Sequence, residues 1–326
     1  MARSRLAAFE SAGERGFIGG DGRDFGLDRE TQSIRPRSGG LMRGISLARQ
    51  DDYLCCHRAL RHYENFRVVS FFVPTHLRPH FWAIYAFCRA VDDLGDEYGG
   101  DRLRALSRFE GELRRAFQGK ATVPEFRALA ETIDRFRLPM EDFLALIEAN
   151  RRDQGTVRYA RFDELLDYCR HSADPVGHLV LALFGYRDDE RRSLSDATST
   201  GLQLVNFWQD LDRDLAQGRC YLPEEDLDRF QVTLAMLEAR QPTPEFRRLM
   251  AFEVERAQAW LSRGSALEGM VPWRLSRQLR LYRLGGSAIL QALRKQAFNP
   301  FLQRPTVGPW DTVRMVWQVL VPGVML

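Results

Sequence analysis

The chain has 326 residues, enough for one large domain or two small ones, and its 44% hydrophobic content and mean hydropathy of −0.36 suit a globular protein with a sizeable core. A formal net charge of +3 is too small to indicate a nucleic-acid partner. Composition therefore favours a folded protein that acts on something other than nucleic acid.

Helical periodicity dominates the sequence from about residue 51 onward, and no alternating pattern predicts a strand. Residues 1–45 are rich in Gly, Arg and Ser without apolar periodicity, and we expect them to be disordered. No boundary rich in Pro, Gly or Ser divides residues 51–300, so we expect one all-α domain at 50–305 and a C-terminal tail at 306–326. We predict helices at 76–97, 101–118, 123–136, 139–152, 162–185, 188–217, 244–268 and 271–298.

Two prolines stand where a helix would begin, Pro139 and Pro223. A third, Pro175, interrupts the predicted helix at 162–185 together with Gly177. A proline inside a helix usually produces a kink, and kinks often line cavities. The segment is therefore either a kinked cavity wall or an ordinary break between two helices.

Two pairs of aspartates, each with a spacing of four residues, are the most informative feature of the chain. Asp92 and Asp96 form the first pair, and Asp210 and Asp214 form the second. Residues four apart lie on one face of a helix, about one turn of roughly 5.4 Å apart. Carboxylates are hard ligands that suit Mg²⁺, whose coordination is often completed by substrate phosphates and water. Two such pairs facing each other would hold Mg²⁺ around a diphosphate, so we expect an enzyme that ionises a prenyl diphosphate.

The residues around the aspartates indicate a binding site and not a solvated helix surface. An aspartate pair on an exposed helix face is usually solvated, but apolar stretches at 81–87 and 202–208 precede these two pairs. Acidic residues at the end of a buried helix indicate the lining of a cavity. Gln203 and Asn206 extend the second pair into a polar stripe on an otherwise apolar segment, and such a stripe needs partners.

The C-terminal part of the chain is basic: no acidic residue lies between Glu268 and Asp311. Four arginines recur there every three residues and share one side of a helix, namely Arg274, Arg277, Arg280 and Arg283. They could face anionic lipid headgroups, supply counter-charge to a diphosphate, or form a solvated face. The apolar tail from Met315 is too short to span a membrane but long enough to dip into its surface.

The five cysteines are scattered and form no Cys-x-x-Cys pair, which is typical of thiols in a reducing cytoplasm. The sequence has no run of 18 apolar residues and no signal-peptide pattern. We therefore expect a cytoplasmic protein that makes peripheral contact with the inner face of the membrane.

The aspartate motifs, with their order and spacing, resemble those of the squalene/phytoene synthase family over roughly residues 55–305. The motifs are Tyr85-x-x-x-Arg89-x-x-Asp92-Asp93-x-x-Asp96, Tyr168-Cys169 with Pro175-Val176-Gly177, Gln203-x-x-Asn206-x-x-x-Asp210-x-x-x-Asp214, and Gly218-Arg219-x-Tyr221-Leu222-Pro223. The resemblance implies a single-domain isoprenoid synthase bundle of helices around a central active-site cavity.

Within the family the chain is most similar to the hydroxysqualene synthase branch of bacterial hopanoid biosynthesis. The supporting segments are His62-Tyr63-Glu64-Asn65-Phe66, Leu77-Arg78-Pro79-His80 and Asn150-Arg-Arg-Asp153-Gln154. Two departures from the wider family bear on the reaction. Gln209 stands where a basic residue is common, and a late-helix tyrosine is replaced near Gly285-Gly286. Because these positions typically help bind diphosphate in relatives that condense two prenyl diphosphates, their loss fits an enzyme with one diphosphate substrate.

The resemblance implies presqualene diphosphate as the substrate and a cluster of Mg²⁺ ions as the cofactor. It also implies five metal ligands: Asp92, Asp96, Asn206, Asp210 and Asp214. The four aspartates among them would be catalytic as well. It implies as substrate-binding residues Tyr85, Arg89, Gln203, Val176 and Gly177. Tyr168 would position a water molecule or steer the rearrangement. Loss of diphosphate would leave a carbocation that water captures as hydroxysqualene, without a nicotinamide cofactor.

Two alternatives stay open. An enzyme of the same fold could condense two farnesyl or geranylgeranyl diphosphates into presqualene diphosphate, squalene or phytoene. A non-catalytic member of the family could act as an assembly factor, although such a protein would be expected to lose its aspartates, and all four are present.

Overall fold

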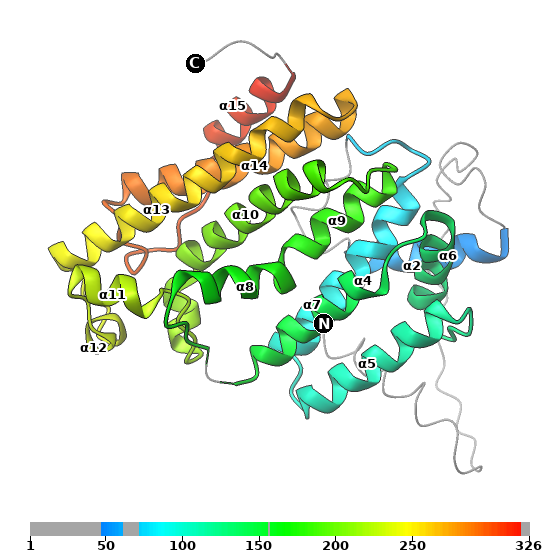
Figure 1. Ribbon diagram of the computed structural model, residues 1–326, viewed down its shortest axis with the longest axis horizontal. Helices are drawn as coiled ribbons and strands as arrows, with labels where there is room; N and C mark the ends of the chain where they lie inside the picture. The colour runs from blue at the N-terminus through cyan, green and yellow to red at the C-terminus, as the bar shows by residue number, and fades with distance from the viewer. Residues whose placement is uncertain (1–46, 61–71, 156, 321–326) are drawn as a thin grey trace, which may run out of the picture.

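The computed structural model describes residues 47–60, 72–155 and 157–320, and all regular elements within these ranges are helices (Figure 1). The predicted all-α class is therefore confirmed. The predicted disordered segment 1–45 and the motif at 62–66 lie outside the described residues. No helix in the described ranges combines the length and the apolar character needed to cross a bilayer.

The helices of the first half of the chain pack around α4. Their bounds are α2 (Leu47–Leu60), α4 (Arg78–Asp96), α5 (Arg102–Phe117), α6 (Pro124–Phe136) and α7 (Met140–Arg152). α4 contacts each of the other four. It buries an apolar face that includes Phe81, Ile84, Phe87 and Val91. Because that face is covered, only the remaining face of α4 is left for polar side chains.

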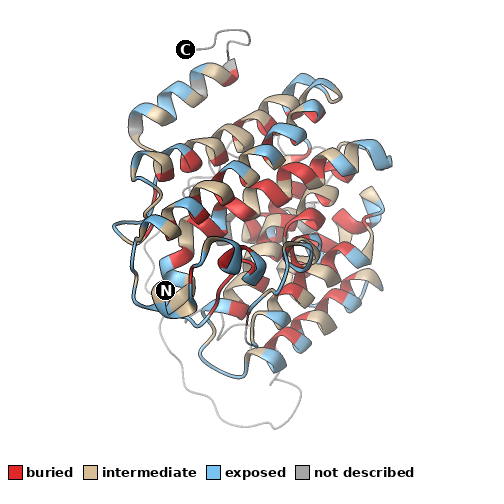
Figure 2. Cartoon of the chain, turned by 60° about the vertical axis from the view of Figure 1, so that its left-hand side comes forward, coloured by how far each residue is buried: buried red, intermediate tan, exposed pale blue. Residues whose placement is uncertain are grey.

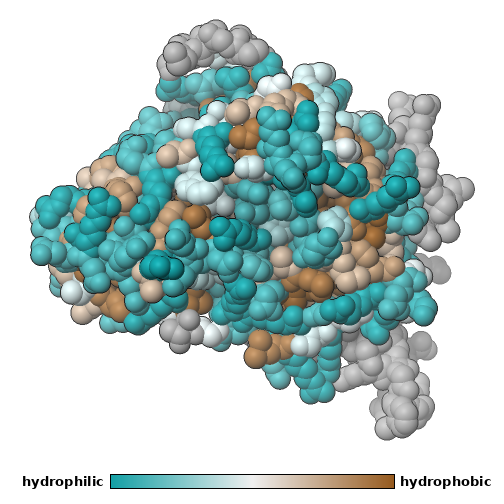
Figure 3. Space-filling view, in the orientation of Figure 1, coloured by the Kyte–Doolittle hydropathy of each residue, from teal (hydrophilic) through white to brown (hydrophobic). Residues whose placement is uncertain are grey.

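The helices of the second half pack around α10. Their bounds are α8 (Phe162–Ser172), α9 (Asp174–Leu183), α10 (Asp189–Ala216), α11 (Glu224–Phe230), α12 (Leu234–Glu238), α13 (Pro244–Gly264), α14 (Trp273–Lys295) and α15 (Pro309–Leu320), with a 3₁₀ turn η1 (Ser265–Gly269). α10 has 28 residues, so it is about 42 Å long. It contacts α8, α9, α13 and α14. In Figure 1 it lies between α8 and α9 on one side and α13 and α14 on the other. Buried residues concentrate on the inner helices (Figure 2), whereas the face shown in Figure 3 is largely hydrophilic.

α10 and α13 cross at glycines. A Cβ added to Gly264 of α13 would lie 2.1 Å from Thr198 Oγ1 and 2.9 Å from the Thr198 backbone nitrogen. A Cβ added to Gly201 of α10 would lie 2.9 Å from the backbone nitrogen of Leu261. These distances are shorter than a real Cβ contact, so glycine at both positions permits the close approach of the two helices.

The predicted helix at 162–185 is wrong, because the structure has two helices there. α8 ends at Ser172, Ala173 leaves helical geometry with φ −124° and ψ −48°, and α9 starts with Pro175 in its first turn. Proline has no backbone N–H to donate, which is harmless in the first turn of a helix but disruptive inside one. The alternative of an ordinary break between two helices is therefore correct.

The other predicted helices are present with boundaries within a few residues, and Pro139 and Pro223 are the N-cap residues of α7 and α11. The C-terminal part of the predicted helix at 244–268 is the 3₁₀ turn η1. Residues 309–320 of the predicted tail form α15, which runs back along α14. Lys295 Nζ lies 3.8 Å from Asp311 Oδ1 at one end, and Val319 packs with Leu281 near the other.

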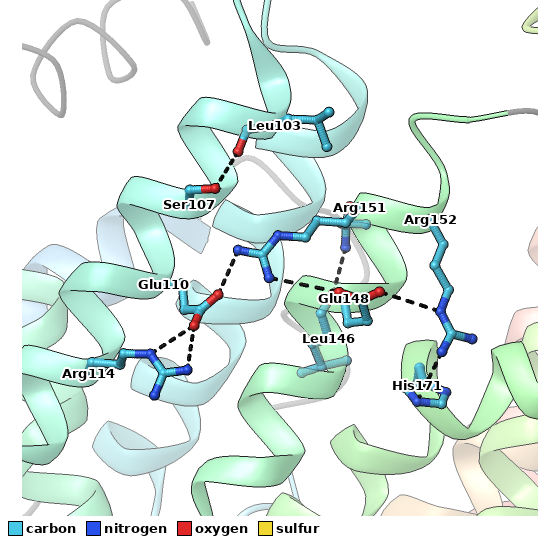
Figure 4. Close-up of polar contacts among 10 residues, drawn as sticks. Leu103, Ser107, Glu110, Arg114, Leu146, Glu148, Arg151, Arg152 and His171 are labelled. Atoms are coloured by element: carbon cyan, nitrogen blue, oxygen red, sulfur yellow. Dashed lines mark hydrogen bonds and ion pairs between the residues drawn. The ribbon is translucent and has the colours of Figure 1, made fainter.

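Ion pairs join α5 to the C-terminal end of α7 (Figure 4). Glu110 of α5 accepts hydrogen bonds of 2.6 Å from Arg114 Nη2 on its own helix and from Arg151 Nη2 on α7. The Arg151 contact is the main reason that the pKa of Glu110 is lowered. The contact holds the end of α7, from which Asn150 and Asp153 reach the aspartates described below.

His178 of α9 links that helix to two others. Its Nδ1 lies 3.1 Å from Asp142 Oδ1 on α7, and its Nε2 lies 2.6 Å from Asp196 Oδ1 on α10. Burial alone would lower the pKa of His178, but the hydrogen bonds to Asp142 and Asp196 outweigh it and raise the pKa to about 9. His178 is therefore protonated near neutral pH and holds α9 between α7 and α10.

We predict that His178→Gln lowers the free energy of unfolding at pH 6 by on the order of 3 kcal/mol. The pKa rises from 6.5 in the unfolded chain to about 9 in the folded one, so this stability is fully present below pH 6.5 and is lost as the pH rises through about 9. Urea unfolding of both proteins at pH 6 and pH 9 measures the difference. His76→Gln, at an exposed position, is the control. An equal difference between wild type and variant at both pH values would contradict a charged His178.

Candidate active site

The predicted polar face of α4 is present as a single stripe. Tyr85, Arg89 and Asp92 are half-buried and Asp96 is exposed, whereas most other residues of the helix are buried. The spacings of four, three and four residues place all four side chains on one face. The structure therefore groups the four residues of the first motif on the face of α4 that the core does not cover.

The second motif forms a matching stripe on α10. Gln203, Asp210 and Asp214 are half-buried and Asn206 is exposed, although the residues between them are among the most buried of the helix, including Leu204, Val205, Phe207 and Trp208. An exposed asparagine in the middle of a largely buried helix requires open space beside it. The stripe thus lines a space instead of packing into the core.

Arg219 brings the two motifs together. α10 ends at Ala216, Gly218 turns the chain with φ 75°, and the backbone N–H of Arg219 donates to the carbonyl of Asp214. Its guanidinium Nη1 then donates to Asp96 Oδ1 of α4 at 2.9 Å. Asp96 in turn raises the pKa of Asp214, so the aspartates of the two helices are close enough to interact.

Burial disfavours the charged form of two carboxylates in this group, those of Asp92 and Asp214. Burial raises the pKa of Asp92 to about 6 against the opposing effect of Arg89, which lies 3.3 Å away. Burial, and then Asp210, raise the pKa of Asp214 to about 7. A site of this kind, with four carboxylates and the amide of Asn206, offers the oxygen donors that Mg²⁺ prefers and gains from a bound cation.

Arginines pair with these carboxylates in the described structure. Besides Arg219 on Asp96, Arg304 from the segment after α14 makes a two-point contact with Asp210, with Nη2 3.0 Å from Oδ2. Gln209 Nε2 donates to the carbonyl of Pro305 at 2.6 Å and fixes the same segment. Among the described residues, no three His, Cys, Asp or Glu side chains are close enough together to form a metal site.

Tyr168 lies in an aromatic cluster beside the aspartates. Its hydroxyl donates to Asp153 Oδ2 at 2.6 Å, and the hydroxyl of Tyr221 donates to Asp153 Oδ1 at 3.3 Å. Burial raises the pKa of Asp153, which also interacts with Arg219 and Asp96. The ring of Tyr221 stacks on Phe207 of α10 with centroids 4.0 Å apart. Tyr168 is therefore linked to the aspartates through Asp153.

Tyr282 of α14 faces the polar stripe of α4. Its hydroxyl lies 3.3 Å from the hydroxyl of Tyr85 on α4. Gly286, one turn later, fits against Leu202 of α10, since an added Cβ would lie 2.9 Å from Leu202 Cδ2. The interpretation of Gln209 and of Gly285-Gly286 as departures from relatives that condense two diphosphates stays a prediction.

Val176 and Gly177 are not brought into the group of aspartates. Gly177 lies where α9 crosses α10, and a Cβ there would be 2.3 Å from Ser195 Oγ and 2.8 Å from Ser199 Oγ. Val176 is half-buried against the core of the first helical group. Both residues place α9 against its neighbours, and their assignment to substrate binding stays a prediction.

Four residues of the site were given no role by the sequence: Asp153, Arg219, Tyr282 and Arg304. Asp153 and Arg219 belong to motifs that the sequence analysis quoted, and Arg304 belongs to the basic C-terminal stretch. Each contacts a residue from a different part of the chain, such as Arg304 with Asp210. The quoted motifs could have pointed to Asp153 and Arg219, whereas no local sequence pattern marks Tyr282 or Arg304.

Comparison with known proteins shows the family of the chain. The family model for squalene/phytoene synthase matches residues 59–311. A phytoene synthase from Arthrospira platensis is 31% identical over 282 residues, covering 80% of this chain and 90% of that protein.

Solved structures of similar proteins also include synthases of this kind. The crystal structure of squalene synthase HpnC from Alicyclobacillus acidocaldarius has 59% sequence identity and a TM-score of 0.76, covering 79% of this chain and 98% of that one. A dehydrosqualene synthase in complex with ligand also has a TM-score of 0.76 at 23% identity, covering 84% and 96%, and shows the shared fold alone. The chain belongs to the squalene/phytoene synthase family, whose members are enzymes that act on prenyl diphosphates.

Proposed function

We propose that this enzyme converts presqualene diphosphate into hydroxysqualene and releases diphosphate, in a Mg²⁺-dependent reaction of squalene and hopanoid biosynthesis. The observation that carries the proposal is the meeting of the two aspartate stripes of α4 and α10 through Arg219. The 59% identity to a protein described as the squalene synthase HpnC supports this branch of the family.

Asp92, Asp96, Asn206, Asp210 and Asp214 would hold Mg²⁺, which supplies positive charge to the leaving diphosphate. Their donor set fits, because carboxylate and amide oxygens are the hard ligands that Mg²⁺ prefers.

The arginines of the site would bind the diphosphate. Arg89 lies on the same face of α4 as Asp92, and a guanidinium matches phosphate oxygens in a two-point geometry. Tyr85, one turn before Arg89, and Gln203, one turn before Asn206, would contact the substrate next to the diphosphate. Val176 and Gly177 would bind the substrate indirectly, by placing α9 as one wall of the substrate site. Apolar and aromatic side chains exclude stray water from the carbocation.

Tyr168 would act through its contact with Asp153. Burial is the main reason that the pKa of Tyr168 is raised well above its ordinary value, so the hydroxyl stays protonated and donates its hydrogen bond. In this state it could orient groups at the aspartates but would not remove a proton from water.

Condensation of two prenyl diphosphates is the second candidate. The observation that favours it is Tyr282, whose hydroxyl adds a second polar group beside Tyr85, 3.3 Å from its hydroxyl. The similarity to phytoene synthases is compatible with this reaction as well. Membership of a family of enzymes disfavours the third possibility, a non-catalytic assembly factor.

The experiment that tests the proposal incubates the purified protein with Mg²⁺ and presqualene diphosphate, without nicotinamide cofactor. Products are identified by gas chromatography and mass spectrometry. We expect hydroxysqualene as the main product. A parallel reaction contains farnesyl diphosphate alone. Its conversion, with presqualene diphosphate left unchanged, would instead assign the enzyme to the condensing branch.

We predict that Asp92→Asn and Asp210→Asn each lower kcat by about 10²-fold or more, because each removes a charge that the metal and the leaving diphosphate require. Asp212→Asn on α10 is the matched control, since Asp212 is exposed and pairs only with Arg240 among the acidic and basic residues described. Circular dichroism checks that each variant is folded. Nearly full activity in either site variant would remove that residue from the proposed metal ligands.

We also propose that α15 binds the surface of an anionic membrane. Its outward face carries Trp310, Val313 and Trp317 with exposed fractions of 85%, 61% and 40%. Arg314 of the same helix is exposed. Residues 269–326 contain eight basic residues against one acidic residue, Asp311, and four of the eight form ion pairs within the protein, namely Arg283, Arg294, Lys295 and Arg304. Tryptophan favours the membrane interface, and basic residues are attracted to anionic headgroups.

We predict that replacing Trp310 and Trp317 together by serine lowers binding to vesicles of phosphatidylglycerol and phosphatidylcholine at least about tenfold, because two large apolar contacts are lost. Vesicle co-sedimentation measures the binding. Leu103→Ser, at an exposed apolar position on α5, is the control. Undiminished binding by the double variant would show that α15 is not the membrane contact.

A further inference from the structure

The inward face of α14 carries two polar side chains in an apolar setting. Gln278 is 2% exposed, and Tyr282 follows it by one helical turn. The residues beside them on the same face, Leu275 and Leu279, are buried in the first core cluster. A glutamine on the inner face of a helix is expensive to bury unless its amide is hydrogen-bonded.

Gln278 is buried, and Tyr282 beside it faces the polar stripe of α4. The Tyr282 hydroxyl is 3.3 Å from that of Tyr85, whose ring stacks on Phe81 with centroids 4.6 Å apart. Tyr85 precedes Asp92 by seven residues on the same face, so the two tyrosines lie roughly 10 Å below the aspartates along the helix. A prenyl substrate anchored by its diphosphate at the aspartates would extend past them.

The amide of Gln278 has no protein partner of good geometry other than the neighbouring Tyr282 hydroxyl. It lies close enough to interact with that hydroxyl and to oppose the rise of its pKa, but the contact falls short of hydrogen-bond geometry, and neither Oε1 nor Nε2 has another partner among the residues that the structure describes. A buried water molecule needs two to four polar partners. The amide of Gln278 and the hydroxyl of Tyr282 supply such partners next to each other.

The two tyrosines can orient a water molecule but cannot deprotonate it. Burial raises the pKa of Tyr85 to about 12, and burial is also the main reason that the pKa of Tyr282 lies well above its ordinary value. Both hydroxyls therefore stay neutral. Tyr168, for which the sequence suggests a similar role, has its hydroxyl engaged by Asp153.

We propose that Gln278 is a positioning residue which, with the hydroxyls of Tyr282 and Tyr85, holds the water molecule that captures the carbocation. This role rests on the proposed conversion to hydroxysqualene. In the step, a lone pair of the water oxygen forms the C–O bond to the cationic carbon. The protonated alcohol then loses one proton to the diphosphate released earlier in the same reaction, which leaves a neutral alcohol and hydrogen diphosphate.

The test separates ionisation from water capture. Wild type, Gln278→Met and Tyr282→Phe are each given presqualene diphosphate and Mg²⁺ in ¹⁸O-labelled water. Diphosphate release reports ionisation, and mass spectrometry reports the labelled alcohol against hydrocarbons formed by proton loss. Gln291→Met, at an exposed position on the same helix, is the matched control.

We expect Gln278→Met to lower the alcohol share of the products at least tenfold while diphosphate release falls less than tenfold. Tyr282→Phe, which removes one oxygen atom and keeps the ring, should shift the products in the same direction. If Gln278→Met does not fold, the product ratio of Tyr282→Phe is the test of the proposed water site. An alcohol share equal to that of wild type in the folded variants, or an equal fall in release and alcohol, overturns the role of Gln278. A wild-type enzyme that releases diphosphate without forming alcohol overturns the proposed function itself, and the role with it.

Discussion

The arrangement of the candidate active site is tied to ion pairs that join carboxylates on two apolar helices to other parts of the chain. Asp96 and Asp214 interact across the gap between α4 and α10, and a like charge nearby raises the free energy of each ionised carboxylate. Arginines from separate segments offset this repulsion: Arg89 from α4, Arg219 from the turn after α10 and Arg304 from the segment after α14. The chain must therefore bring these segments to one end of the bundle, and the packing of the helices provides that arrangement.

Much of the fold follows from the sequence, because long helices with a strong apolar face are specified locally. α4, α5 and α10 begin and end within a few residues of their predicted bounds. The error at 162–185 arose because apolar periodicity continues across the break, while the geometry of Ala173 and Pro175 decides whether one helix or two forms. α2, α12 and α15 were missed, and α11 was marked only by Pro223 at its start, because a short or terminal helix is stabilised mainly by what it packs against.

The site was predictable to the extent that its residues share a helix face. The stripes of α4 and α10 follow from a spacing of three and four residues, and the structure confirms both stripes. The contacts that join them do not follow from spacing. Arg219 reaches Asp96 over 123 positions of sequence, and Tyr282 reaches Tyr85 over 197. Such pairs depend on how the helices cross, which no local pattern encodes.

The crossing of α10 and α13 restricts how this enzyme can change over time. At Gly264 the nearest atoms include the backbone of Thr198, and a backbone cannot rotate aside as a flexible side chain can. A methyl group there would push the two helices apart and turn the aspartate stripe of α10 relative to α4. Gly264 therefore tolerates no larger side chain without movement of a helix, although the residue lies away from the aspartates. The distance between two backbones, set far from the site, thus limits which sequences can hold the α10 stripe in place.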